Sequence, residues 1–134
     1  MRFVDTNVFL YHMANDPRYG EQASKIIRRI EEGEGASTST LVIGQACSYL
    51  KWKKKADAIP PFLAFLRSVP NLAKVETTFL HFAQAEEFCA KRGIAWKSWD
   101  DAIIAIQMRD LGIGEIYTND SDFDVMPGIE RIFR

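Results

Sequence analysis

The stretch MRFVDTNVFLY, residues 1–11, decides how the rest of the chain is interpreted. Phe3 and Val4 are apolar, and the chain before them leaves no room for a helix, so they predict a short buried strand. Asp5 interrupts the apolar pattern where the next helix is expected to begin. In an open α/β sheet, ligands bind beyond the carboxyl ends of the strands, so Asp5 is well placed for chemistry. The same residue also suits a simple helix cap that accepts the free N–H groups of the next turn.

We expect residues 1–134 to form a single domain, because the chain is long enough for one hydrophobic core. The net charge of −1 neither favours nor excludes nucleic acid, so an RNA site would need a local basic patch or a metal. Cys47 and Cys89 lie in apolar helical patterns and predict reduced core residues in a cytoplasmic protein. No apolar run approaches the roughly 20 residues that a membrane span needs, and Asp5 interrupts any leader-like segment. We therefore expect no membrane association.

Apolar periodicity predicts helices that alternate with short strands. The helices are expected over residues 8–14, 19–32, 41–54, 56–68, 79–92 and 99–111, and the strands over 3–4, 36–38, 72–76, 115–117 and 132–133. This order predicts an α/β fold with a mainly parallel central sheet and helices on both faces. Ser98 is expected to cap the last helix in a capping box with Asp101. The residues of helix 79–92 expected to face the core are Phe79, Phe82, Ala83, Ala85 and Cys89.

Acidic side chains end two predicted strands and begin the last predicted helix. Asp5 follows the first strand and Asp120 follows strand 115–117, so parallel pairing would bring both to one edge of the sheet. Asp101, in the first turn of the last helix, can point at the same edge. Neighbouring carboxylates raise one another's pKa, and Mg²⁺ or Mn²⁺ relieves this repulsion by taking oxygen ligands. Taken one by one, the same acids also suit an ordinary helix start and an ordinary turn.

Four motifs together carry a resemblance to a known family. These motifs are VDTNVFLY (4–11), STLVIGQACSYL (39–50), WDDAIIA (99–105) and IYTNDSDF (116–123). In this order and spacing they resemble the PIN-domain family, which includes the VapC-type toxins of toxin–antitoxin pairs. The resemblance implies a PIN-like fold and an Mg²⁺- or Mn²⁺-dependent endoribonuclease that hydrolyses RNA phosphodiester bonds. It also implies an antitoxin protein as partner and a homodimer.

Motif position then implies a role for each polar residue. The metal ligands implied in this way are Asp5, Asp101 and Asp120. Asp101 matches the helix acid of the family better than Asp100 does, and Asp122 would be an accessory ligand acting through a water molecule. The residues that would support these ligands or contact the substrate are Thr6, Asn7 and Thr118.

One position departs from the family pattern. The family usually places a Glu in the helix over 41–54, and the matching residue here is Gln45. Its amide oxygen can still coordinate a hard cation, but it is neutral and cannot act as a base, so metal binding should be weaker. The chain is then a weak or inactive natural member, or an engineered variant, or a protein in which Glu86 or Glu87 compensates. The rival interpretation is a PIN-like module that binds RNA or a protein partner without cutting it.

Two further groups of residues are open to more than one interpretation. Lysines gather at the end of helix 41–54, where cations stabilise a helix terminus or contact an RNA backbone; they include Lys51, Lys53 and Lys54. Trp96 and Trp99 suit the core or a dimer interface, and also the stacking of an unpaired base. Dinucleotide binding is excluded because no Gly-rich turn follows the first strand.

Overall fold

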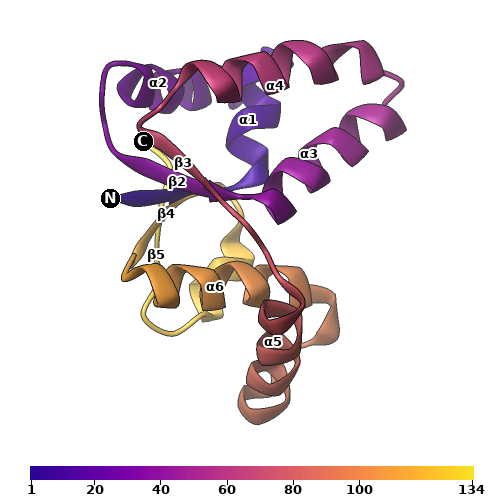
Figure 1. The fold of residues 1–134 in the computed structure, drawn as a ribbon, viewed down its shortest axis with the longest axis vertical. Helices are drawn as coiled ribbons and strands as arrows, with labels where there is room; N and C mark the ends of the chain where they lie inside the picture. Colours follow the sequence, from indigo (N-terminus) through magenta and orange to yellow (C-terminus); the bar gives the residue numbers. More distant parts are fainter.

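A five-stranded parallel sheet forms the centre of the computed structural model, which describes residues 1–134 (Figure 1). Its strands are β1 (Arg2–Val4), β2 (Ala36–Ser39), β3 (Leu72–Val75), β4 (Glu115–Tyr117) and β5 (Glu130–Ile132). They pair in the order β3-β2-β1-β4-β5, and every pairing is parallel. The chain therefore extends the sheet first on one side of β1 and later on the other. Such a reversal places a crevice at the carboxyl end of β1.

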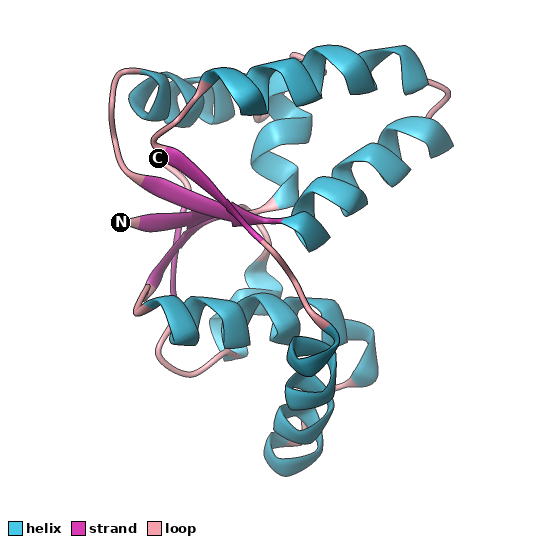
Figure 2. Ribbon diagram, in the orientation of Figure 1, coloured by secondary structure: helices cyan, strands magenta, loops and turns pink.

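Helices cover both faces of this sheet, as Figure 2 shows. They are α1 (Thr6–Met13), α2 (Gly20–Glu31), α3 (Thr40–Trp52), α4 (Ile59–Ser68), α5 (Phe79–Arg92) and α6 (Trp99–Leu111). The first four lie on one face, and α5 and α6 lie on the other (Figure 1). The predicted α/β fold is thereby confirmed. No helix has both the length and the apolar character that crossing a membrane requires.

Sequence patterns explain most of the helix boundaries. In α2, the buried residues recur at helical spacing and face the sheet: Ala23, Ile26, Ile27 and Ile30. The predicted helix from residue 56 is wrong at its start, because 56–58 form a separate 3₁₀ turn before α4. Pro60 and Pro61 lie in the first turn of α4, where their missing N–H groups would have no partner in any case.

The start of α5 departs from the prediction. Ala85 and Cys89 are buried as expected, but Phe79 is 82% exposed and Ala83 is also exposed. The reason is that both residues lie on the side of α5 that lines an open groove with Trp96 and Trp99, where no further element covers them. Ser98 occupies the cap position of α6 but makes no side-chain capping bond, so the predicted capping box with Asp101 is wrong.

The last segments differ slightly from expectation. The segment predicted as a loop after β4 contains a 3₁₀ turn, Ser121–Val125. The final strand is Glu130–Ile132, one residue short of Phe133, whose ring instead packs 6.0 Å from those of Tyr11 and Tyr19.

The sheet ladder continues just past β1 and β4. The Asp5 N–H donates to the Tyr117 carbonyl at 3.1 Å, and the Thr118 N–H donates to the Ile132 carbonyl at 3.0 Å. Asp5 and Thr118 are therefore held side by side by backbone bonds at the crevice.

Candidate metal centre

Asp5 is both a helix cap and a member of the acidic site. One carboxylate oxygen accepts from the Thr6 N–H at 2.7 Å, which caps α1. The other accepts from the Thr118 hydroxyl at 2.8 Å and from the Asn7 side-chain amide at 3.4 Å. The residue is only 6% exposed. The two interpretations of Asp5 are thus compatible in one geometry.

A small network fixes the loop after β4 to the start of α1. The Asn7 amide nitrogen donates to the Thr118 hydroxyl oxygen at 2.9 Å, and its carbonyl oxygen accepts from the Asn119 N–H at 3.2 Å. The Asp120 N–H also donates to the Thr118 hydroxyl, at 3.0 Å. Because Thr118 bonds to both Asp5 and the backbone of Asp120, its hydroxyl sets the spacing of the two acids. The structure therefore places Asn7 and Thr118 directly behind the predicted ligands.

Side chains from α1, α3 and α6, and from the segments that follow β1 and β4, line one open pocket. Its lining is formed by Asp5, Thr6, Asn7, Leu10, Gln45, Tyr49, Asp100, Asp101 and Asp120. Carboxylate oxygens of Asp101, Asp120 and Asp122 all lie within 4.8 Å of one another. The structure thus brings together Asp5, Asp101 and Asp120, with the more exposed Asp122 at the margin.

The acids of this pocket repel one another, and none of them forms an ion pair with a basic side chain. Burial, together with the charges of Asp100, Asp5, Asp120 and Asp122, raises the pKa of Asp101 to about 8. Burial also raises the pKa of Asp5 to about 6, against the hydrogen bonds from Thr118 and Thr6. In the protein alone, the pocket therefore holds a proton that a cation would displace.

Gln45 and Asp100 are joined by a hydrogen bond. The Gln45 amide nitrogen donates to Asp100 at 2.9 Å, and its oxygen accepts from the Thr6 hydroxyl at 3.0 Å. A glutamate at this position would lose the donor and face the Asp100 carboxylate at the same distance. Asp100, which the sequence interpretation ranked below Asp101, lines the pocket beside it. The signal available in the sequence was the pair of adjacent acids in one helix turn.

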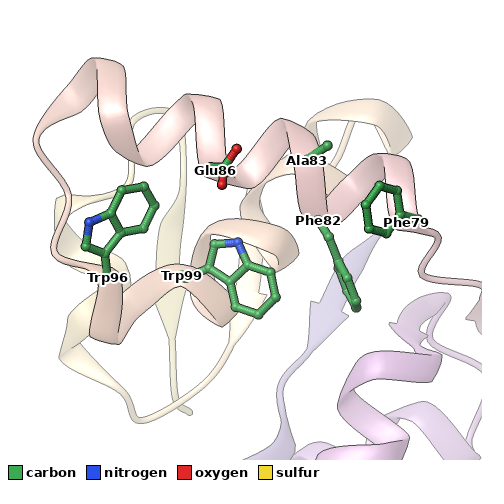
Figure 3. Close-up of a pocket in the computed structure, with 6 residues that line it drawn as sticks. All are labelled: Phe79, Phe82, Ala83, Glu86, Trp96 and Trp99. Carbon is green, nitrogen blue, oxygen red and sulfur yellow. The ribbon is translucent and has the colours of Figure 1, made fainter.

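Glu86 and Glu87, the acids suggested as compensating for Gln45, do not line this pocket. Glu87 is exposed and pairs with Lys91 at 2.7 Å. Glu86 lies in a separate apolar groove between α5 and the start of α6, together with Trp96 and Trp99 (Figure 3). The suggestion that either glutamate compensates for Gln45 therefore has no support in the structure.

Neither tryptophan of that groove lines the acidic pocket. Trp99 packs against Phe82 with ring centroids 5.2 Å apart, and Trp96 is 60% exposed. Both face the same groove as Phe79 (Figure 3). The predicted lysines lie elsewhere, at the end of α3, where Lys51, Lys53 and Lys54 are exposed.

The donor set of the acidic pocket fits a hard divalent cation. It offers several carboxylate oxygens and no histidine or cysteine, which is the chemistry that Mg²⁺ and Mn²⁺ prefer. A cation at this place would offset the repulsion that raises the pKa of Asp5 and Asp101. The pocket is also open enough to admit a second ligand of the cation from solution, such as a phosphate group.

Residues 2–129 match the family model described as "PIN domain". No curated protein matches the chain by sequence.

Several solved structures share the fold at low sequence identity. VapC20 of Mycobacterium tuberculosis, a sarcin-ricin loop cleaving toxin, superimposes with a TM-score of 0.80 and 21% identity over 95% of each chain. VapBC2 of Rickettsia felis, bound to a DNA fragment from its promoter, gives 0.71 and 13%, covering 98% of this chain and 96% of the other. DNA-bound VapBC of Salmonella typhimurium gives 0.65 and 19%, with 98% and 97% covered. At these identities the likeness shows a shared fold.

Proposed function

The chain belongs to the PIN-domain family, and on this premise we propose that it is a metal-dependent endoribonuclease, the toxin of a toxin–antitoxin pair. The observation that carries the proposal is the acidic pocket, where buried Asp5 and half-buried Asp101 face further carboxylates with no basic partner. Residues 1–134 are proposed to form a single PIN domain.

We assign Asp5, Asp101 and Asp120 as the metal ligands, with Asp122 acting through water. Mg²⁺ or Mn²⁺, when bound, supplies an activated water and stabilises negative charge on the phosphate that is cut. Thr6 and Thr118 already hold Asp5 in place, so metal binding costs little further side-chain conformational entropy at this residue. The carboxylates of Asp101 and Asp120 are the groups able to orient the attacking water and to accept its proton.

We further propose that Asp100 replaces the charge missing at Gln45. With Asp100, the pocket lining holds four carboxylates, Asp5, Asp100, Asp101 and Asp120. The Gln45 amide donates to Asp100 and holds it toward the pocket, and the Asp101 N–H donates to the other oxygen of Asp100 at 3.0 Å. The acid would thus have moved from α3 to α6 without loss of charge, which favours an active enzyme.

The partners proposed for the chain follow from its structural neighbours. VapBC2 of Rickettsia felis and VapBC of Salmonella typhimurium were solved as VapBC proteins bound to DNA, and a Klebsiella pneumoniae neighbour is a toxin–antitoxin complex. We therefore propose an antitoxin protein as a partner, RNA as substrate, a homodimer as the working form, and a cytoplasmic location.

RNA cleavage with and without metal tests the proposal. The purified chain should cut RNA with Mn²⁺ or Mg²⁺ and stop when EDTA is added. Asp5→Asn should lower the rate at least about 100-fold while staying folded by circular dichroism, because it removes a ligand charge. The matched control is Asp124→Asn, an exposed acid that pairs with Arg131 outside the pocket, which should keep the rate. Cleavage that persists in EDTA, or in Asp5→Asn, would show that the assignment is wrong.

The second candidate function is a binding module that no longer cuts RNA. Gln45 favours it, since the amide cannot act as a base and its oxygen is already occupied by the Thr6 hydroxyl. Absence of cleavage in the wild-type chain and also in Gln45→Glu, with both proteins folded, would support this candidate over the nuclease.

A further inference from the structure

One face of α3 leads from the acidic pocket to the surface of the molecule. Gln45 and Tyr49 both line the pocket, and Trp52 ends the helix. These three residues are spaced by four and three positions, so their side chains follow one another along the same side of α3. The helix rises about 10 Å from Gln45 to Trp52.

Two exposed aromatic rings form what we call the Tyr49–Trp52 platform at the end of this face. Their centroids are 6.0 Å apart with an angle of 56° between the planes. Trp52 is 73% exposed and Tyr49 is 42% exposed, so neither ring belongs to the core. The Lys53 ammonium lies 5.1 Å from the Trp52 ring centroid and 5.9 Å from that of Tyr49. The platform thus combines open aromatic faces with a cation.

Four lysines lie beside the platform in the sequence, and no acidic side chain pairs with any of them. These lysines are all exposed and form no ion pair or side-chain hydrogen bond: Lys51, Lys53, Lys54 and Lys55. The helix terminus accounts for only part of this cluster, because Lys54 and Lys55 lie beyond the end of α3. On a chain with a net charge of −1, such a cluster is a local anion-binding surface.

We propose that the Tyr49–Trp52 platform stacks an unpaired base of single-stranded RNA whose scissile phosphate lies at the acidic pocket. The lysines beside it contact the backbone of the same strand. This inference rests on the proposed function and adds a substrate class to it. The rise of about 10 Å along α3 from Gln45 to Trp52 is one that about two or three nucleotides of a single strand cover.

The chemistry of the platform favours a single strand over a duplex. Stacking on an aromatic side chain needs a base whose face is free, and bases within a duplex are already stacked on each other. The negatively charged backbone of RNA also complements the lysines beside the platform, whereas an apolar protein surface would leave them without a partner. The groove of Trp96 offers the contrast, since its lining contains Glu86 and no lysine (Figure 3).

Binding of a short fluorescein-labelled single-stranded RNA, followed by anisotropy, tests the inference. Measurements in EDTA and again with Ca²⁺ keep the experiment independent of cleavage. Trp52→Ala should weaken binding about 10-fold, since a stacked base contributes about that much, and Trp52→Phe should restore most of it. The matched control is Trp96→Ala, which also removes an exposed tryptophan and should leave the affinity unchanged. A duplex RNA of the same length should bind both alanine variants as it binds the wild type.

Three results of the binding measurements would overturn the inference. Absence of single-strand binding by the wild-type chain in both solutions would do so, as would equal losses for Trp52→Ala and Trp96→Ala. An unchanged RNA affinity of Trp52→Ala, with altered self-association in sedimentation, would assign the platform to a protein contact instead. Cleavage with Mn²⁺ is measured separately on the same proteins. Its absence, with the Trp52-dependent binding intact, would contradict the proposed nuclease and its scissile phosphate, while supporting the platform as a binding site for single-stranded RNA.

Discussion

The acidic pocket and the Tyr49–Trp52 platform share one face of α3, but they gather side chains of opposite charge. The pocket gathers carboxylates without a basic partner, and burial holds some of them at raised pKa. The platform gathers lysines without an acidic partner and keeps them exposed. The pocket is held by hydrogen bonds from neighbouring elements, whereas the platform is held by α3 alone.

This difference in charge and exposure predicts which kind of ligand each region binds. An acidic cluster that hydrogen bonds hold in place favours a cation, because its geometry is fixed before the ion arrives. An exposed basic surface attracts any phosphate chain, and its contribution depends on salt. Together they account for how RNA, itself an anion, approaches a site lined with carboxylates. In this proposal, the platform would attract the strand and a cation would screen the carboxylates of the pocket.

The largest effect is expected for Thr118→Val, which removes the hydroxyl that joins Asp5 to the backbone of Asp120. Mn²⁺ affinity should fall about 10- to 100-fold, because residues that orient metal ligands contribute this much. Thr118→Ser keeps the hydroxyl and is the matched control. Calorimetric titration of the folded proteins gives the comparison, and equal affinities for the two variants would show that the pocket does not depend on this bond.

A loss of about 10-fold in Mn²⁺ affinity is expected for Asp100→Asn. The double variant Gln45→Glu with Asp100→Asn returns the charge to α3 and should recover most of the affinity. Gln45→Glu alone places a carboxylate against Asp100 and should lower the melting temperature in EDTA. If Asp100→Asn bound Mn²⁺ as tightly as the wild type, the proposed transfer of charge to α6 would be wrong.

A smaller effect, about fivefold in RNA affinity at low salt, is expected for Lys53→Ala combined with Lys54→Ala. Two lost phosphate contacts should also reduce the slope of log affinity against log salt by about 1.4, since each contact to a single strand contributes about 0.7. Lys91→Ala, on α5 and paired with Glu87, serves as the control. A slope equal to that of the wild type would remove these lysines from the RNA-binding surface.

The stability of the metal-free protein should fall gradually as the pH rises, because of Asp101. The pKa of Asp101 is raised from 3.8 to about 8 on folding, so the folded state holds a proton that the unfolded state releases. The stabilisation is complete below the unfolded pKa and is lost as the pH rises through about 8. In EDTA, the melting temperature should therefore fall between pH 5 and pH 9. Asp101→Asn should flatten this dependence, and a slope as steep as that of the wild type would contradict the burial of Asp101.

Much of this architecture could be predicted from the sequence because it rests on local patterns. The apolar residues before Asp5 and Asp120 mark strands, and parallel pairing then brings both acids to one edge. The exposed Phe79 could not be predicted, since helical spacing reveals an apolar face but not whether another element covers it. The same limit explains the wrong capping box at Ser98.

The sequence predicted that the acids would lie close together, but it did not predict which polar side chains would pair with them. Asp100 was passed over in favour of Asp101 because only the fold shows that Gln45 reaches it across the gap between α3 and α6. Tyr49 was missed although it follows Gln45 by one helical turn, because its role depends on where α3 points. Contacts between distant elements carry this information, and no spacing within one segment does.

Mn²⁺ binding at pH 7.5, measured by calorimetry in two buffers of different ionisation enthalpy, tests the acidic pocket most directly. We predict saturable binding with proton release, because the ion displaces the proton held by the raised pKa of Asp101. Asp101→Asn should bind more weakly and release fewer protons. Absence of saturable binding, or the same affinity and proton release in Asp101→Asn, would contradict the metal centre.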